Sequence, residues 1–386
     1  MVYGMSAIFQ DLTFCDQSSK LEACILNIIA LKTNFTLTQL GWNHHFSQYF
    51  SAEPSSGFEA GRIAVENKNN YVILSTHGVL QGEASGKLQY TSQAEAELPK
   101  VGDWVVMQVF DQQAIIHEVL PRQTKFARGA AGKANEEQIV ATNIDALLIV
   151  QSVDGNYNLR RLERYLVMAY EGKIEPVIVL SKVDLANDLP QKLQEVSTVT
   201  PGVPLLAVSN QTAQGYEALE SWLPPQKTIA VVGSSGVGKS TIINHLLGES
   251  KQDTQGIRSK DSKGRHTTTR REMHLTSKGN ILIDTPGMRA LQLWENQEGL
   301  SQTFADIEAL AKQCHFKDCK HITEVKCAVR KAVEEGVLTE ARYQSYLKLQ
   351  RETAYLESST DFLREKNARF KQIQKAYRQK MKHHKK

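Results

Sequence analysis

The stretch Gly233-Ser-Ser-Gly-Val-Gly238-Lys239-Ser240 decides the fold of this chain. It follows the apolar, β-branched run Lys227–Val232, which is typical of a buried parallel strand, and it precedes Thr241–Gly248, which predicts a helix ended by glycine. Strand, glycine-rich loop and helix in this order predict a phosphate-binding loop, in which backbone N–H groups surround phosphates at a helix N-terminus. A chance glycine loop is the alternative, and the flanking strand and helix disfavour it.

The side chains of this loop suit a nucleoside triphosphate. Lys239 is placed to reach the β- and γ-phosphates, and the hydroxyl of Ser240 is placed to bind Mg²⁺. We expect the following residues to contact the nucleotide: Gly233, Ser234, Ser235, Gly236, Val237, Gly238, Lys239, Ser240 and Thr241.

A second phosphate-side motif, Asp284-Thr-Pro-Gly287, begins at the end of the apolar run Asn280–Asp284. Ligands of open α/β sheets bind at the carboxyl ends of the strands, where this aspartate falls. We expect Asp284 to hold Mg²⁺ through water and the Gly287 N–H to contact the γ-phosphate. An ordinary Pro-Gly turn is the alternative.

The polar segment Glu249–Thr269 lies between the two motifs and predicts a switch loop. It ends in His266-Thr267-Thr268-Thr269, and we expect Thr268 to bind Mg²⁺ and the γ-phosphate. The runs Arg271–Thr276 and Asn280–Asp284 flank Ser277-Lys278-Gly279, which predicts an antiparallel hairpin.

Met288 follows the second motif, where many GTPases have a glutamine that orients the attacking water. A methionine side chain cannot orient water, so we expect slow intrinsic hydrolysis unless another group takes this role. His266 is the nearest candidate in sequence, and a solvated loop histidine is the alternative.

The residues that should recognise the base precede the phosphate loop. Ser181-Lys182-Val183-Asp184 follows the apolar run Glu175–Ser181 and differs from the common Asn-Lys-x-Asp motif at its first position. The aspartate at the last position of this motif accepts two hydrogen bonds from guanine, so Asp184, together with Lys182, favours guanine. Ser181 is shorter than the usual asparagine and could lose contacts to the base and to the phosphate loop. After a further strand, Val203–Val208, Ser209 and Asn210 stand where such proteins support the base from the other side.

The order of these motifs is unusual, because the base-reading motif ends about fifty residues before the phosphate loop begins. An α/β sheet keeps its spatial arrangement when its termini are joined and the chain is reopened elsewhere, since domain termini often lie close together. The sequence therefore predicts a circularly permuted α/β P-loop GTPase domain that binds GTP or GDP with Mg²⁺.

Three cysteines and a histidine, Cys314, Cys319, His321 and Cys327, fall within 14 residues and have the spacing of a closed tetrahedral Zn²⁺ site. Neither a secretion signal nor an 18-residue apolar run is evident, so we expect a cytoplasmic chain with no membrane contact, in which such a cluster binds metal. Scattered buried cysteines are the alternative. Cys15 and Cys24 show no partner pattern.

The first third of the chain differs in character, because short apolar alternations recur between Gly61 and Val119, separated by turn residues. They predict a small β-barrel of the oligonucleotide-binding (OB) type, which contacts RNA or serves as a scaffold. The runs are Arg62–Val65, Tyr71–Leu74, Trp104–Val109 and Ala114–Val119.

The C-terminal tail is strongly basic, with ten Lys or Arg against one acid in residues 362–386, while the whole chain has a net charge of +4. A basic helix suits a phosphate backbone, and a frayed, solvated terminus is the alternative. The chain has 386 residues, 41% of them hydrophobic and 23% charged, which predicts two or three domains. We expect an N-terminal extension (1–50), the barrel (51–125), the GTPase domain (135–295), a helical zinc-binding domain (296–350) and the basic tail (351–386).

In this order, barrel, permuted GTPase and Cys-x₄-Cys-x-His-x₅-Cys, the chain resembles the ribosome small-subunit-dependent GTPase A family over about residues 40 to 350. Asn158-Leu-Arg-Arg-Leu-Glu-Arg-Tyr165 and Gly264-Arg-His-Thr-Thr-Thr269 also match. The resemblance implies a monomeric factor in late maturation of the small ribosomal subunit, which contacts that subunit and its rRNA. It also implies that the subunit stimulates GTP hydrolysis and that His266 replaces the missing glutamine.

The departures from the family pattern are Ser181, Asn210, the N-terminal extension and the extended tail, and they are typical of a divergent paralogue. Two other functions stay open on the residues alone. One is an ATP-using P-loop enzyme such as a kinase, in which Asp184 has no purpose. The other is an RNA-binding assembly protein whose nucleotide site switches with negligible turnover, as Met288 permits.

Overall fold

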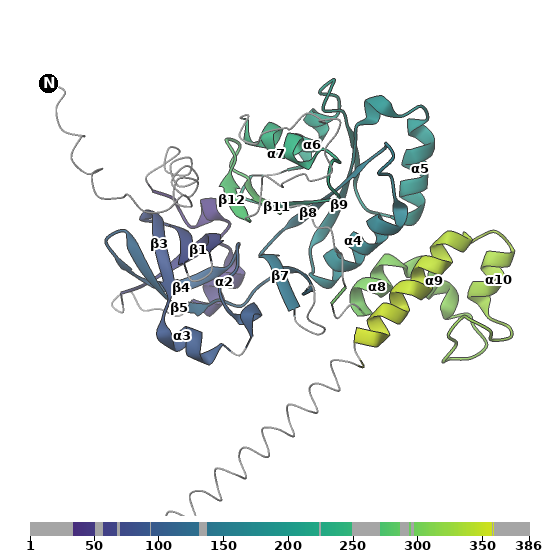
Figure 1. Ribbon diagram of the computed structural model, residues 1–386, viewed down its shortest axis with the longest axis horizontal. Coiled ribbons are helices and arrows are strands. Elements are labelled where there is room, and N and C mark those ends of the chain that lie inside the picture. The colour runs from purple at the N-terminus through teal and green to yellow at the C-terminus, as the bar shows by residue number, and fades with distance from the viewer. Residues whose placement is uncertain are drawn as a thin grey trace, which may run out of the picture.

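A computed structural model describes residues 34–50, 57–67, 70–92, 94–130, 137–223, 225–248, 271–285, 293–294, 297–356 and 358. The basic tail beyond residue 358 lies outside these residues. The described elements fall into three parts along the chain, namely a barrel, a central α/β sheet with its helices, and a group of helices at the C-terminal end (Figure 1).

The central part is an α/β sheet in which β11 lies between β8 and β13. The strand order is β10-β9-β8-β11-β13-β12, parallel except for β12. β8, β11 and β13 are buried at every position, as strands covered on both faces are. The bounds are β8 (Ala146–Ser152), β9 (Glu175–Ser181), β10 (Leu205–Val208), β11 (Thr228–Val232), β12 (Glu272–Leu275) and β13 (Ile281–Asp284).

The chain crosses this sheet in a permuted order, because β8, β9 and β10 run outward before β11 returns to the other side of β8. The carboxyl ends of β8 and β11 therefore border the crevice in which open α/β sheets bind ligands. The hairpin of β12 and β13 is confirmed. The helices are α4 (Leu159–Glu171), α5 (Leu189–Val199), α6 (Tyr216–Trp222) and α7 (Lys239–Leu247), with a 3₁₀ turn η4 (Val183–Leu185).

The N-terminal part is a closed five-stranded barrel, so the predicted OB-type barrel is confirmed. Its order is β1-β2-β3-β5-β4, with β4 pairing back to β1 and with β3 parallel to β5. The sequence pattern does not predict β3, because its apolar run is broken by Gly82. The bounds are β1 (Phe58–Asn67), β2 (Asn70–Ser75), β3 (Gly78–Ala84), β4 (Trp104–Phe110) and β5 (Gln113–Val119), with α3 (Gly86–Thr91) and η3 (Glu95–Glu97) between β3 and β4.

Arg62 joins the barrel to the segment before it and the linker after it. Its guanidinium, 1% exposed, donates to the carbonyls of Leu40, Gly102 and Asn143 and lies over the Trp104 ring. Burial lowers the pKa of Arg62 to about 10, so it stays charged at neutral pH. The preceding segment contains η1 (Thr38–Leu40) and α2 (His44–Tyr49).

Barrel and central sheet are hydrogen-bonded to each other, because β1 pairs with β12 at Val65 and Glu272 and joins the strands into one eleven-stranded sheet. A separate two-stranded ribbon, β6 (Lys125–Gly129) and β7 (Glu137–Thr142), lies in sequence between the two parts. Arg271, just before β12, donates to the carbonyl of Ile139 in β7. The hairpin that leads to Asp284 is thus held by barrel and ribbon together.

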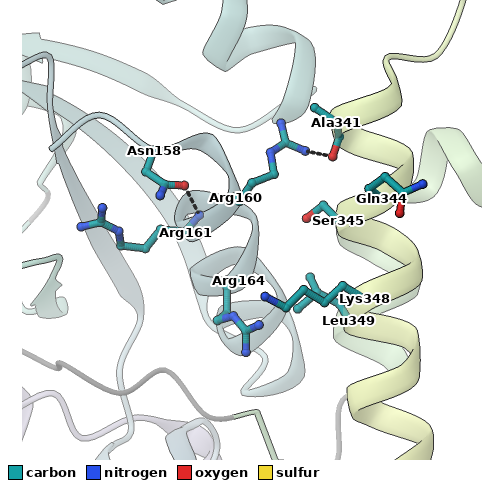
Figure 2. A pocket seen from close by; sticks show the side chains of 9 residues that line it. All are labelled: Asn158, Arg160, Arg161, Arg164, Ala341, Gln344, Ser345, Lys348 and Leu349. Carbon is teal, nitrogen blue, oxygen red and sulfur yellow. Dashed lines mark hydrogen bonds between the residues drawn. The ribbon is translucent and has the colours of Figure 1, made fainter. Parts of the chain in front are cut away.

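The C-terminal helices form a group of which the first packs on α4. They are α8 (Gln297–Thr303), α9 (Ala305–Ala311), α10 (Ala328–Glu334) and a helix over residues 340–356. The 340–356 helix lies beside α4, where Arg160 of α4 reaches the carbonyl of Ala341 at 3.1 Å (Figure 2). Within the described ranges, no helix combines the length and apolar character that crossing a membrane requires.

Candidate nucleotide and metal sites

The loop between β11 and α7 has the backbone shape that a phosphate-binding loop needs. Gly233, Gly236 and Gly238 have φ of 148°, 79° and 95°, a region that side chains with a Cβ avoid. A Cβ on Gly233 would also collide with the carbonyl of Val150 in β8. Gly238 caps α7, which begins at Lys239, two residues earlier than predicted, so Ser240 and Thr241 lie in its first turn.

Lys239 is folded back onto its own loop. Its ammonium donates to the carbonyl of Ser234 at 2.6 Å. Burial lowers the pKa of Lys239 to about 8, although the charge of Asp284 opposes this shift. The buried hydroxyl of Ser234 has no hydrogen-bond partner within the described part of the chain. A partly desolvated cation beside an unpaired buried hydroxyl favours an anionic ligand at this position.

Ser181 ties the base-reading motif to the phosphate loop. Its buried hydroxyl donates to the carbonyl of Val237 at 2.5 Å, across 56 residues of sequence. The serine that departs from the asparagine of the common motif therefore still makes a bond to the loop. Asp184 is exposed beyond the same strand end and accepts a bond from the Ser209 hydroxyl at 2.6 Å.

Two residues of this region were missed by the sequence analysis. Asp154 pairs with Lys182 at 2.7 Å, and the amide of Asn156 donates to the carbonyl of Ser235 at 3.3 Å. Burial acts to raise the pKa of Asp154, but bonds from Lys182, Ser152 and the Asn156 backbone outweigh it and bring the pKa to about 2. The available signal was their position, since polar residues follow the buried strand β8 at its carboxyl end.

Asn210 lies against the phosphate loop. A Cβ on Gly238 would come within 2.7 Å of the Asn210 side-chain nitrogen, so the amide would have to shift. The side-chain oxygen of Asn210 accepts a hydrogen bond from the Tyr216 hydroxyl. The centroid of the Tyr216 ring lies 3.8 Å from that of the His245 ring in α7.

Asp284 ends β13 and is buried, and Thr285 after it donates to the carbonyl of Val231 at 2.6 Å. The crevice thus gathers Asp284, the phosphate loop and the base-reading motif from the ends of β13, β11 and β9. His266, Thr268, Gly287 and Met288 lie outside the described residues.

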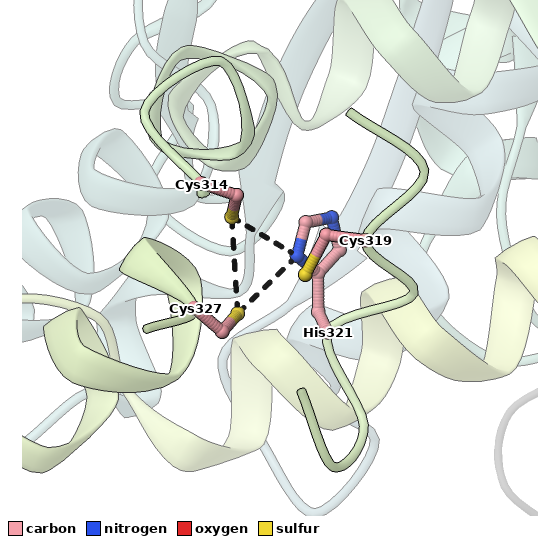
Figure 3. Close-up of side chains that lie close together, drawn as sticks. All are labelled: Cys314, Cys319, His321 and Cys327. Atoms are coloured by element: carbon pink, nitrogen blue, oxygen red, sulfur yellow. Dashed lines mark hydrogen bonds between the residues drawn. The ribbon is translucent and has the colours of Figure 1, made fainter. Parts of the chain in front are cut away.

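The cysteine and histidine cluster forms a compact set in the C-terminal part (Figure 3). The Cys314 Sγ lies 3.6 Å from the His321 Nδ1 and 3.9 Å from the Cys327 Sγ. The distance between the His321 Nδ1 and the Cys327 Sγ is 3.4 Å. All four ligand atoms, including the Cys319 Sγ, lie within 4.8 Å of one another. Ligands around tetrahedral Zn²⁺ would be about 3.6–3.8 Å apart, so the donor set fits this ion.

The backbone around the cluster is held in place from outside. The Tyr343 hydroxyl donates to the carbonyl of His321 at 2.5 Å, and the Glu324 carboxylate accepts backbone bonds from Lys320 and Ile322. Burial lowers the pKa of His321, which favours the neutral imidazole that a metal ligand requires.

Sheet order, phosphate loop and an earlier base-reading motif define the class of this chain, a circularly permuted P-loop GTPase. The comparisons with known proteins agree with that class. The family model described as RsgA GTPase matches residues 119–294. A model described as ABC transporter matches residues 216–385, a stretch that contains the phosphate loop.

The curated relatives decide between these two models. The "Small ribosomal subunit biogenesis GTPase RsgA" of Opitutus terrae is 41% identical over 89% of this chain and 97% of its own length. A protein named RsgA 2 from Vibrio vulnificus is 43% identical over 89% and 95%, and another from Lactiplantibacillus plantarum is 48% identical over 76% and 83%. The chain belongs to the RsgA family of GTPases.

Solved structures share the fold. YjeQ from Thermotoga maritima is 26% identical, with a TM-score of 0.58 over 77% of this chain and 99% of its own. The structure titled "YloQ, a circularly permuted GTPase" is 24% identical, with a TM-score of 0.55 over 78% and 97%, and shows the shared fold.

Proposed function

We propose that this chain hydrolyses GTP during biogenesis of the small ribosomal subunit and that the subunit stimulates the reaction. The supporting observation is the crevice that gathers the base-reading motif, the phosphate loop and Asp284. The relatives' names supply the ribosomal role. An ATP-using enzyme and a switch without turnover are not favoured, since the relatives are named as GTPases.

On the base side, Asp184 would accept two hydrogen bonds from guanine. Its carboxylate is already oriented by the Ser209 hydroxyl, so less freedom is lost on binding. Lys182 is held by Asp154 in a left-handed backbone conformation with φ of 59°. Because Ser181 is bonded to the phosphate loop, base and phosphates would bind to one connected unit.

On the phosphate side, Lys239 would leave the Ser234 carbonyl and contact the β- and γ-phosphates. Ser240 in the first turn of α7 and Asp284 at the end of β13 would hold Mg²⁺, which neutralises charge on the phosphates. We also assign Thr268 and Gly287 to the γ-phosphate side and His266 to orienting the attacking water.

Cys314, Cys319, His321 and Cys327 would hold a structural Zn²⁺, because four protein ligands leave no open position for catalysis. Barrel and zinc-binding part would contact rRNA on either side of the GTPase domain, in a cytoplasmic monomer. In this hypothesis GTP orders the switch loop, and hydrolysis weakens the hold on the subunit.

The test is GTP turnover by the purified chain with and without isolated small ribosomal subunits. We expect strong stimulation by the subunits, and no turnover in a Lys239→Ala variant that still folds. Competition of ATP against labelled GTP measures base selection, and ATP should compete poorly. Unstimulated turnover alongside tight GTP binding would overturn the ribosomal role, and parent turnover by Lys239→Ala would overturn the site.

A further inference from the structure

A groove of about 600 Å³ runs between α4 and the 340–356 helix (Figure 2). One wall comes from the GTPase domain and the other from the C-terminal helices. The lining residues are Asn158, Arg160, Arg161, Arg164, Ala341, Gln344, Ser345, Lys348 and Leu349.

The lining carries four cations and no carboxylate. Two cations are structural. Arg160 bonds to Glu163 at 2.7 Å, and Arg164 makes two bonds to Glu352 at 2.6 and 2.8 Å. The other two, Arg161 and Lys348, have no carboxylate partner among the described residues, and Arg161 donates one hydrogen bond to the carbonyl of Asn156 at 3.3 Å. Figure 2 shows Lys348 extending from its helix toward Arg164, so two cations converge at one end of the groove.

The walls are fixed by a buried ion network. Arg342, 3% exposed, pairs with the fully buried Glu163 at 2.9 Å and with Asp306 at 2.7 Å. The Ser345 hydroxyl donates to the same Glu163 at 2.6 Å. Opening this interface would leave buried charges without their partners, which is strongly unfavourable. The groove is therefore a permanent feature of the fold.

The surface between the cations is largely apolar. Ala341 and the methylene stems of the arginines and Lys348 supply this surface, and Leu349, which is 2% exposed, lies behind it. The amide side chains of Gln344 and Asn158 offer both donors and acceptors. Apolar surface beside guanidinium planes suits a stacked nucleobase, while unpaired cations suit phosphates.

We propose that this groove binds a segment of single-stranded RNA, with Lys348 and Arg161 contacting phosphates and the apolar wall contacting a base. An acidic peptide would pair with the cations but would not use the flat guanidinium faces for stacking, as a base does. The sequence after the 340–356 helix extends the same sign of charge, with ten Lys or Arg against one acid in residues 362–386. The proposal rests on the proposed function only for the source of the RNA.

The test is fluorescence anisotropy of a labelled single-stranded RNA oligonucleotide titrated with the full chain at several salt concentrations. Lys348→Glu reverses one groove charge, and the double variant Gln344→Glu/Lys348→Glu adds another. Lys312→Glu is the matched control, because Lys312 is exposed at the end of α9 and outside the groove. It changes the net charge equally, so any RNA binding by the basic tail is affected alike.

We expect Lys348→Glu to weaken RNA binding about tenfold and to reduce the slope of log K against log salt by about 1, as the loss of one phosphate contact predicts. Lys348→Arg should bind like the parent, and Lys312→Glu within about twofold of it. Equal binding by Lys348→Glu and Lys312→Glu would overturn the proposal. So would unchanged RNA binding together with competition for the groove by a polyglutamate peptide.

The assay uses no ribosomal subunit and no nucleotide turnover. A failure of subunit stimulation would therefore leave its result unaffected, and basal GTP turnover of the Lys348 variants should equal that of the parent.

Discussion

Glu272 of β12 lies directly opposite Asp284 of β13, the carboxylate at the phosphate end of the sheet. On its other side Glu272 pairs with Val65 of barrel strand β1. Val65, Glu272 and Asp284 therefore lie side by side on three neighbouring strands, in one row across the sheet. A displacement of the barrel would be passed through a single strand to the metal side of the nucleotide site.

The first prediction tests this row. Glu272→Pro removes a backbone donor from a strand that has neighbours on both sides, which a sheet interior does not tolerate. We expect Mg²⁺-dependent GTP turnover to fall at least tenfold, while GDP binding without Mg²⁺ falls less. Glu272→Ala keeps the backbone bonds and should stay within about twofold of the parent. Equal turnover by the proline and alanine variants would show that the row carries no coupling.

The second prediction concerns Ser181. Ser181→Ala leaves the carbonyl of Val237 without its side-chain donor in a buried place, which costs about 1–3 kcal/mol. We expect GDP affinity, measured by calorimetry, to fall about tenfold. Ser221→Ala is the control, because Ser221 also donates to a carbonyl but is exposed on α6. If the two variants bind GDP equally well, Ser181 does not support the loop.

The motifs of the nucleotide site could be placed from sequence because each follows a short apolar run whose end is marked by glycine or by polar residues. β9 begins and ends where predicted, and β11 begins one residue later. The cysteine spacing likewise fixed a cluster before any geometry was known. The residues that serve the site from neighbouring loops could not be found in this way. Asp154 and Asn156 acquire their roles only when β8 is placed beside β11.

Long-range charge pairs were also beyond the sequence. Arg342 and Glu163 are 179 residues apart, and nothing in their local patterns marks them as buried partners. Arg62 begins an apolar run, where a charged residue is expected to face solvent. In the structure its buried guanidinium instead donates hydrogen bonds to three carbonyls that are distant in sequence. The domain boundaries and the roles of His266, Thr268 and Gly287 stay predictions.

The third prediction is a pH dependence. The pKa of Lys239 is lowered to about 8 in the nucleotide-free fold, below its unfolded value of 10.5, so the free protein binds fewer protons between these values and gains stability as pH rises through them. Phosphates would raise this pKa again, so GDP binding must take up a proton in the same window. Affinity should therefore decrease as pH rises above about 8.

Calorimetry of GDP binding in two buffers of different ionisation enthalpy measures this uptake. At about pH 8.5 we expect more than roughly half a proton per GDP, and at about pH 7 only a small fraction. Lys239→Arg, whose guanidinium keeps its charge, should show no such difference if it binds GDP. Equal uptake at both pH values in the parent would rule out the desolvated lysine.

The last prediction concerns the metal cluster, which we expect to hold one zinc ion per chain. Cys327 is buried and also caps α10, since the Arg330 N–H points to its sulfur at 3.5 Å. Serine is a favoured N-cap residue, so Cys327→Ser should lose the metal while keeping the start of that helix. Because structural zinc contributes folding free energy, the variant and the chelator-treated parent should both be cleaved readily by protease between residues 314 and 327. Atomic absorption measures the metal.

His315→Ala alters an exposed residue next to the cluster and should keep full zinc. A parent chain that stays free of zinc after reconstitution, or a Cys327→Ser variant that keeps a full equivalent, would contradict the site. Tyr343 donates to the His321 carbonyl from the 340–356 helix, so loss of the metal should also loosen that helix.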